Sequence, residues 1–154
     1  MKIINGAYPP NIDEIRKYLP IHDKVVFCWG DLLFNPNNLR IDPALMAHEQ
    51  VHFDQQMRYG KNSFWQNFTL PKYRIGKWWD RYLKNYAFRL SQEIPAYQKQ
   101  YWEYCKVLKD KNDQNRMAIM LAKDLSSPLY GNLISTENAI KAIKEEKLYD
   151  FKVS

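Results

Sequence analysis

Residues 48–52 of this chain are His48-Glu49-Gln50-Val51-His52, a stretch that predicts both a helix and a metal site. On a helix, side chains four residues apart lie on one face, with Cβ atoms about 5–6 Å apart. Two imidazoles at this spacing can bind one Zn²⁺ without distorting the backbone. Glu49 projects toward the edge of that face, so its carboxylate can reach a water at the metal without being a ligand. The pattern predicts a zinc site with His48 and His52 as ligands and Glu49 as general base.

The residues around this motif predict where its helix begins and ends. Asp42 is a suitable N-cap, and Pro43 occupies the first helical position, where proline is favoured. Gly60 supplies a stop after Tyr59. We therefore expect one helix over residues 43–59. The alternative is an amphipathic helix with two surface histidines and a solvated glutamate, which we place behind the zinc site because the chain has only three histidines.

A catalytic zinc site needs a third protein ligand, and Glu93 is the best candidate. His22, the remaining histidine, lies upstream in a predicted loop. Glu93 stands near the expected start of a long helix, which Ser91 can cap and which tolerates Pro95 only close to its start. The alternative for Glu93 is an ordinary N-terminal glutamate favoured by the helix dipole. Tyr97 shares the face of Glu93 and can hydrogen-bond a ligand.

Together these motifs resemble the gluzincin metallopeptidases, and the short chain is similar to the small forms called minigluzincins, which are common in phage and bacteria. The resemblance covers about residues 24 to 105. The matching residues are His48, Glu49, His52, Glu93, Ala96 and Tyr97. The resemblance implies a zincin-like domain that uses Zn²⁺ to hydrolyse a peptide or protein substrate.

The rest of the chain predicts a mainly α domain (α+β) with a small N-terminal β-hairpin packed beside the zinc helix. The hairpin consists of strands over Val25–Trp29 and Leu32–Phe34, joined by a two-residue turn at Gly30-Asp31. Its edge can pair with an extended peptide, or the hairpin can simply cover the core. Four further helices are expected, over residues 11–18, from near Glu93 to 109, over 116–125 and over 136–147. The third should bury Met117, Met120 and Leu121 on one face, and Thr136 should cap the fourth. We expect a single domain over residues 1–154.

Tyr130 lies in a predicted loop over residues 126–131. Zinc peptidases often need a Tyr, His or Arg donor for the oxyanion, and Tyr130 or His22 could serve. For each we favour the structural alternative, a packed tyrosine or a surface histidine.

A basic and aromatic segment precedes Glu93 in a chain of net charge +6. Its basic residues are Lys72, Arg74, Lys77, Arg81, Lys84 and Arg89. Such a segment can bind nucleic acid or another anionic polymer. We favour a structural interpretation, in which the helically spaced Trp79, Leu83, Tyr86 and Leu90 form a buried stripe and the basic residues form the solvated face.

Composition restricts the cellular setting only in part. No apolar run approaches the ~20 residues that span a bilayer, and the N-terminal residues lack the features of a secretory signal. The two cysteines do not form a disulfide framework. We expect a cytoplasmic protein, although delivery by phage lysis or a virion would leave no mark on the sequence. An inactive zinc protein with a role in phage assembly is the remaining alternative function, and the sequence indicates no oligomeric state.

Overall fold

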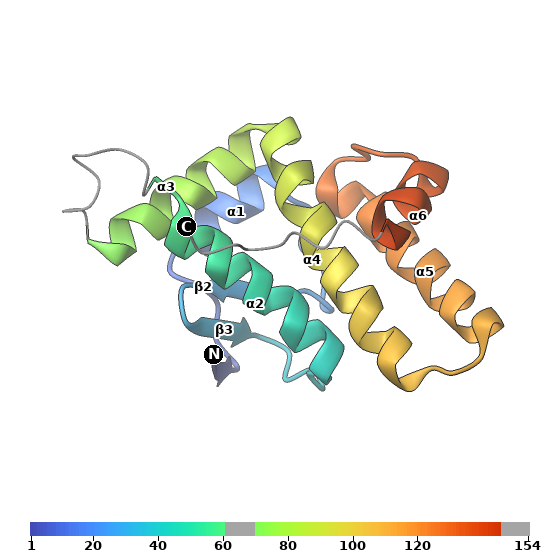
Figure 1. Cartoon of the computed structure of the whole chain (residues 1–154). Coiled ribbons are helices and arrows are strands. Elements are labelled where there is room, and N and C mark those ends of the chain that lie inside the picture. The colour runs from blue at the N-terminus through green and yellow to red at the C-terminus, as the bar shows by residue number, and fades with distance from the viewer. Residues whose placement is uncertain (61–69, 146–154) are drawn as a thin grey trace.

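The structure is a computed structural model that describes residues 1–60 and 70–145 (Figure 1). Its elements are β1 (Lys2–Asn5), α1 (Ile12–Tyr18), β2 (Phe27–Trp29), β3 (Leu32–Asn35), α2 (Pro43–Arg58), α3 (Pro71–Lys84), α4 (Tyr86–Val107), α5 (Lys111–Leu125), the 3-10 helix η2 (Pro128–Tyr130) and α6 (Thr136–Lys144). The predicted fold class is confirmed, because helices dominate and the only strands in the described residues form one small sheet.

The sheet has the strand order β1-β3-β2 and lies beneath α2 in Figure 1. The predicted hairpin of β2 and β3 is present and antiparallel, with Cys28 opposite Leu33. Gly30 adopts a φ of 59°, which suits glycine in a tight turn. β1 was not predicted, and it pairs in parallel with β3.

Side chains from two helices bind backbone groups at β2 and at the turn that follows it. The carbonyl oxygen of Cys28 accepts hydrogen bonds from Gln56 Nε2 at 3.0 Å and Trp79 Nε1 at 3.2 Å. The Gly30 N–H donates to Gln56 Oε1 at 2.7 Å. These two backbone groups are therefore not available to an added peptide strand, and the pairing of the rest of the edge with a peptide stays a prediction.

The helix α2 has nearly the predicted bounds. Asp42 caps it by accepting a hydrogen bond from the Leu45 N–H at 2.8 Å, and Pro43 is its first residue. The chain leaves the helix at Tyr59, and Gly60 follows with a φ of 76°. Both motif histidines lie within the buried part of this helix.

The helix α4 crosses the middle of the molecule, with α2 and α3 on one side and α5 and α6 on the other (Figure 1). The predicted start near Glu93 is wrong. Asn85 caps the helix by accepting from Phe88 N–H, whereas the Ser91 hydroxyl donates to the Phe88 carbonyl. Pro95 lies inside the helix. Packing on both sides therefore outweighs the loss of one helical hydrogen bond at the proline.

The predicted apolar stripe along the basic-aromatic segment is only partly correct. Trp79 and Leu83 are buried, but Tyr86 is 64% exposed because the chain turns at Asn85 between α3 and α4. The basic face is also only partly correct, because Arg89 is buried. The exposed members are Lys72, Lys77, Arg81 and Lys84.

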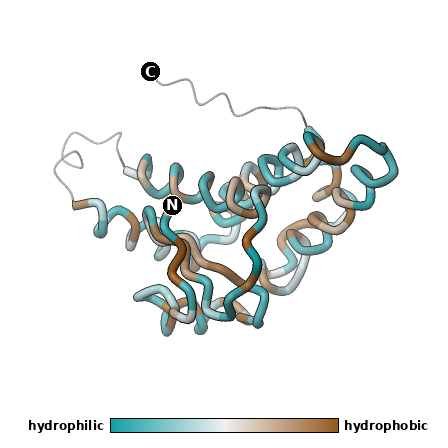
Figure 2. Tube along the Cα trace, turned by 90° about the horizontal axis from the view of Figure 1, so that it is seen from below, coloured by the Kyte–Doolittle hydropathy of each residue, from teal (hydrophilic) through white to brown (hydrophobic). Residues whose placement is uncertain are grey.

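Two apolar clusters lie on either side of α4. One joins α1, β2 and α3 around Ile15, Phe27 and Trp78. The other joins α4, α5 and α6 around Tyr101, Leu121 and Ile143. Viewed from the side of the sheet, hydrophobic residues alternate with hydrophilic ones along the helices (Figure 2).

Three details at the C-terminal side differ from prediction. The helix α5 begins at Lys111 rather than at 116, because Asp110 accepts hydrogen bonds from two amides of its first turn. Met120 is exposed rather than buried with Leu121. Ser135, not Thr136, caps α6, and the predicted end at 147 lies outside the described residues. Among the described helices, none is long and apolar enough to cross a membrane.

Candidate metal centre

His48, His52 and Glu93 converge to form a buried group that could hold a metal ion. His48 Nε2 and His52 Nε2 lie 3.1 Å apart. Glu93 Oε1 lies 3.3 Å from His52 Nε2, and Glu93 Oε2 lies 3.7 Å from His48 Nε2. All three side chains are at most 9% exposed.

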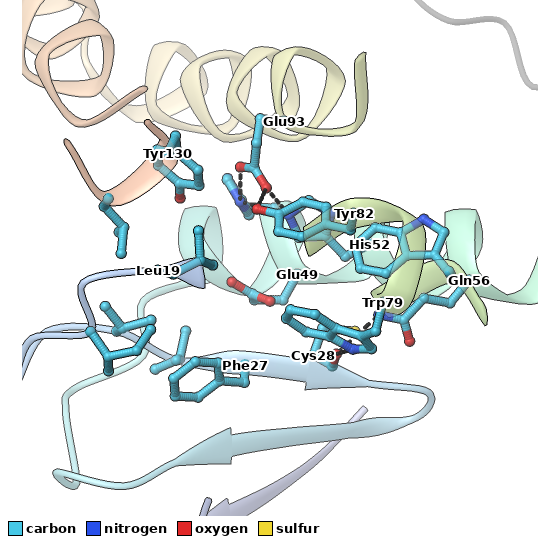
Figure 3. A pocket seen from close by; sticks show the side chains of 16 residues that line it. Leu19, Phe27, Cys28, Glu49, His52, Gln56, Trp79, Tyr82, Glu93 and Tyr130 are labelled. Carbon is cyan, nitrogen blue, oxygen red and sulfur yellow. Dashed lines mark hydrogen bonds and ion pairs between the residues drawn. The ribbon is translucent and has the colours of Figure 1, made fainter. Parts of the chain in front are cut away.

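Two helices create this convergence. The two histidines are one turn apart on α2, so their rings lie on the same face. The helix α4 packs against α2 and brings Glu93 to that face, although Glu93 follows His52 by 41 residues (93 − 52 = 41). Ala96, one turn beyond Glu93, is fully buried, as expected for a small residue where helices approach closely. Figure 3 shows Glu93 reaching from α4 toward His52.

The donor atoms fit a single ion. Ligand atoms at about 2.0–2.1 Å around a tetrahedral zinc lie about 3.3–3.4 Å from one another. The three observed separations of 3.1, 3.3 and 3.7 Å bracket this value. In addition, Glu93 Oε2 is buried and has no hydrogen-bond partner within the described residues. Such an orphaned oxygen is costly unless a cation or another donor satisfies it.

Two glutamines fix the orientation of the histidine rings. The Nδ1–H of His48 donates to Gln100 Oε1 at 3.0 Å, and the Nδ1–H of His52 donates to Gln55 Oε1 at 2.9 Å. Gln55 is itself oriented, because its Nε2 donates to the Gln92 carbonyl. An amide oxygen only accepts, so each Nδ1 carries a proton, and Nε2 is the ring atom that each histidine can offer to a metal.

Tyr82 fixes the third candidate ligand. Its hydroxyl donates to Glu93 Oε1 at 2.5 Å, and its ring stacks on Trp78 at a centroid distance of 4.8 Å. Trp78 also lies against the His52 ring, at 5.8 Å. This aromatic wall excludes water from one side of the centre and holds the Glu93 carboxylate in place.

The charges of the group are strongly coupled. Burial and the neighbouring His52 lower the pKa of His48 to about 4. Burial acts to lower the pKa of His52 as well, but the charge and hydrogen bond of Glu93 outweigh it and raise this pKa to about 9. Burial acts to raise the pKa of Glu93, and His52 outweighs that effect and lowers it. In the metal-free protein these shifts favour a protonated His52 beside an ionised Glu93.

Glu49 occupies a different environment although it adjoins His48. It is 5% exposed, and no group in residues 1–60 or 70–145 donates a hydrogen bond to its carboxylate. Burial raises its pKa to about 7. The charge of His52 acts to lower this pKa, and the charge of Glu93 adds a smaller increase. Figure 3 shows the carboxylate pointing into a cavity beside Phe27 and Trp79. The cavity has a volume of about 60 Å³ and is otherwise mostly apolar.

Tyr97 and Tyr130 lie beside the centre, but Tyr97 does not make the predicted hydrogen bond to a ligand. Its ring instead packs edge-on against His48 at 4.7 Å, and its hydroxyl donates to the Tyr130 hydroxyl at 3.1 Å. Tyr130 borders the cavity that contains Glu49, so a role toward an oxyanion stays a prediction. Burial raises the pKa of both tyrosines well above the usual value.

His22 does not join the candidate ligands. It is exposed, and its Nδ1 accepts a hydrogen bond from the Lys24 N–H at 3.2 Å. It borders an outer groove of about 260 Å³ that is also lined by His48, Glu49 and Tyr130. The groove therefore connects the surface near His22 to the centre.

Sequence reasoning missed Tyr82, Gln55 and Gln100 as residues of the centre. A signal existed for the glutamines. Gln55 follows His52 by three residues, and Gln100 follows Glu93 by seven, so each shares a helix face with a candidate ligand. No local pattern pointed to Tyr82, because its contact with Glu93 depends on the turn between α3 and α4.

No protein-family model, curated protein or solved structure matches this chain. The function is therefore inferred from the geometry of the site.

Proposed function

We propose that this protein is a zinc-dependent hydrolase of the gluzincin type and that it cleaves a peptide bond. The observation that carries the proposal is the placement of Glu49. A buried carboxylate without a hydrogen-bond donor adjoins a buried set of two histidines and one glutamate. A purely structural zinc site has no use for such a group, because structural sites are closed by four protein ligands.

Zinc fits the donor set best. Two imidazoles and a carboxylate with one open position form a common catalytic zinc set. The same donors also suit iron in some oxygenases, so metal analysis is part of the test. The order of the ligands along the chain, with His48 and His52 on one helix and Glu93 on the next but one, supports the gluzincin resemblance.

The chemistry requires a proton carrier and an oxyanion donor. A bound zinc ion supplies Lewis acidity to the scissile carbonyl and acidity to the attacking water. Glu49 takes the proton of that water and delivers it to the leaving nitrogen. Because Tyr97 donates to the Tyr130 hydroxyl, the proton of Tyr130 is free to point into the cavity toward a developing negative charge.

The dimensions of the site favour an extended substrate. The inner cavity of about 60 Å³ holds only a few waters or a small side chain. Its walls include Leu19, Ile21 and Phe27, which suit an apolar group. A folded segment does not fit, so the substrate enters through the outer groove as a single extended chain.

Cleavage profiling tests the proposal. Zinc-loaded wild-type protein and a Glu49→Gln control are each incubated with a denatured proteome, and new N-termini are identified by mass spectrometry. We expect a defined set of new termini with the wild-type protein alone. Identical profiles from the two proteins, at full zinc occupancy, would contradict peptidase activity.

A further inference from the structure

Arg89 is a buried guanidinium without an acidic partner in the part of the chain that the structure describes. It is 1% exposed and lies on α4, one turn before Glu93. None of the ion pairs among residues 1–60 and 70–145 includes it. A buried charge without a counter-ion is costly, so its other interactions must account for its presence.

Its donors bind three backbone carbonyls instead. Nε donates to the Tyr82 carbonyl at 3.0 Å and Nη2 to the Leu83 carbonyl at 2.7 Å, both in the last turn of α3. Nη1 donates to the Tyr130 carbonyl at 3.0 Å, at the end of η2. Carbonyls at helix C-termini carry partial negative charge and lack helical partners. The rigid guanidinium, with five N–H donors in a fixed plane, is better pre-organised for three separate acceptors than the flexible ammonium of a lysine.

The two segments that Arg89 joins carry side chains of the metal centre. From α3, Tyr82 donates its hydroxyl to Glu93 Oε1, and the Arg89 guanidinium lies 5.5 Å from the centre of the Tyr82 ring. From η2, Tyr130 borders the cavity that contains Glu49. The guanidinium thus connects one residue that orients a ligand with one that forms the cavity wall.

We propose that Arg89 is a positioning residue of the metal centre, which fixes Tyr82 and Tyr130 relative to Glu93 and so sets the metal affinity. This inference rests on the proposed zinc site. Its immediate consequence is that Arg89 and Tyr82 act on zinc affinity through one pathway rather than independently.

A double-mutant cycle tests this consequence. Zinc dissociation constants are measured by competition with a chromophoric chelator for the wild-type protein, Arg89→Lys, Tyr82→Phe and the double variant. We expect each single variant to weaken binding about 10- to 100-fold, as is usual for residues that orient metal ligands. The double variant should bind no more weakly than the weaker single variant. Losses that multiply would show independent effects and overturn the proposal.

Arg81→Lys is the matched control, because Arg81 is exposed on α3 and packs over Phe88. Its zinc affinity should equal that of the wild-type protein.

If Arg89→Lys does not fold, amide hydrogen exchange of the wild-type protein tests the positioning role of Arg89 instead. Zinc should slow exchange of the Gly131 amide, which donates to the Pro128 carbonyl. Unchanged exchange at this amide overturns the proposal. Absence of zinc binding by the wild-type protein would instead overturn the proposed function.

Discussion

Glu49 differs from the other polar residues of the centre because each of those already has a hydrogen-bonding partner. His48 is held by Gln100, and Tyr82 holds Glu93. Glu49 has only the cavity in front of it. A carboxylate in this situation can accept a proton from water without first breaking another interaction, which is what a general base requires.

Replacement of this group should separate metal binding from hydrolysis. Glu49→Gln preserves the shape of the side chain but cannot accept a proton at neutral pH. We expect full zinc content by elemental analysis and a loss of turnover on the order of 10²–10⁴. Glu103→Gln is the control, because Glu103 pairs on the surface with Lys99 and Lys106. Full turnover by Glu49→Gln would show that another group is the base.

The glutamines that orient the histidines offer a second test at this scale. Gln100→Leu removes the acceptor for His48 Nδ1–H while keeping a similar volume. We expect zinc to bind about 10- to 100-fold more weakly, with unchanged stoichiometry at saturation. Gln98→Leu is the matched control on the same helix, since Gln98 is buried but donates to the Ala142 carbonyl, away from the centre. Equal affinity of the two variants would contradict the orienting role.

Among the elements, α4 determines whether the centre forms, because it places Glu93 beside two histidines of another helix. Glu93→Ala should weaken zinc binding by more than the ~10–100-fold expected for an orienting residue, since a ligand is lost. Glu103→Ala should leave affinity unchanged, because ten residues of helix place it about 15 Å away along the axis. Titration of both variants with zinc checks this, and the reverse outcome would refute the assignment of the third ligand.

The difference between α2 and α4 shows how far local sequence determines an element. The bounds of α2 were predictable because Asp42, Pro43 and Gly60 act within the helix and its ends. The start of α4 was not, because a proline inside a helix is an unfavourable local signal that only distant packing can outweigh. Tertiary contacts on both sides of α4 supply that packing.

The same contrast applies to the candidate site. The grouping of His48, His52 and Glu93 was predictable, because the chemistry of metal sites restricts which residue types and spacings can serve. The contacts that Tyr82 and Arg89 make beside this group were not predictable, because they depend on the turn at Asn85 and on the position of η2. In the sequence, Arg89 cannot be distinguished from the exposed basic residues that precede it in the same basic-aromatic segment.

At the scale of the whole molecule, a metal at this centre would link α2 to α4 and thereby the two apolar clusters. Zinc that binds only the folded state at a hundred times its dissociation constant adds about 2.7 kcal/mol of stability. For a chain of this size we expect the melting temperature to rise by about 5–10 °C. Calorimetry of the metal-free and zinc-loaded proteins measures the shift. His48→Ala should abolish it, and a shift retained by that variant would indicate zinc bound elsewhere.

The proton that His52 carries in the metal-free protein should make zinc binding depend on pH. In the metal-free protein the raised pKa of His52, about 9, keeps this ring protonated at neutral pH, whereas His48, with a pKa of about 4, is already neutral. Zinc needs both rings unprotonated, so binding releases about one proton, and affinity should rise about tenfold per pH unit up to about pH 9. Isothermal titration in two buffers of different ionisation enthalpy measures the number of protons released when zinc binds. Equal heats in both buffers would contradict the predicted proton release.

The scarcity of histidine also makes this chain convenient for magnetic resonance. Protein labelled with ¹⁵N only at histidine yields signals from three imidazoles, of which two belong to the centre and the third, His22, is exposed. The Nδ1 protons of His52 and His48, which Gln55 and Gln100 accept, are protected from solvent exchange and should give resolved resonances. The ring proton of His22 should not, because this exposed ring accepts a hydrogen bond at Nδ1 and has its N–H at Nε2. His22 thus serves as an internal reference for His48 and His52, and metal binding at the centre can be followed in solution without a substrate.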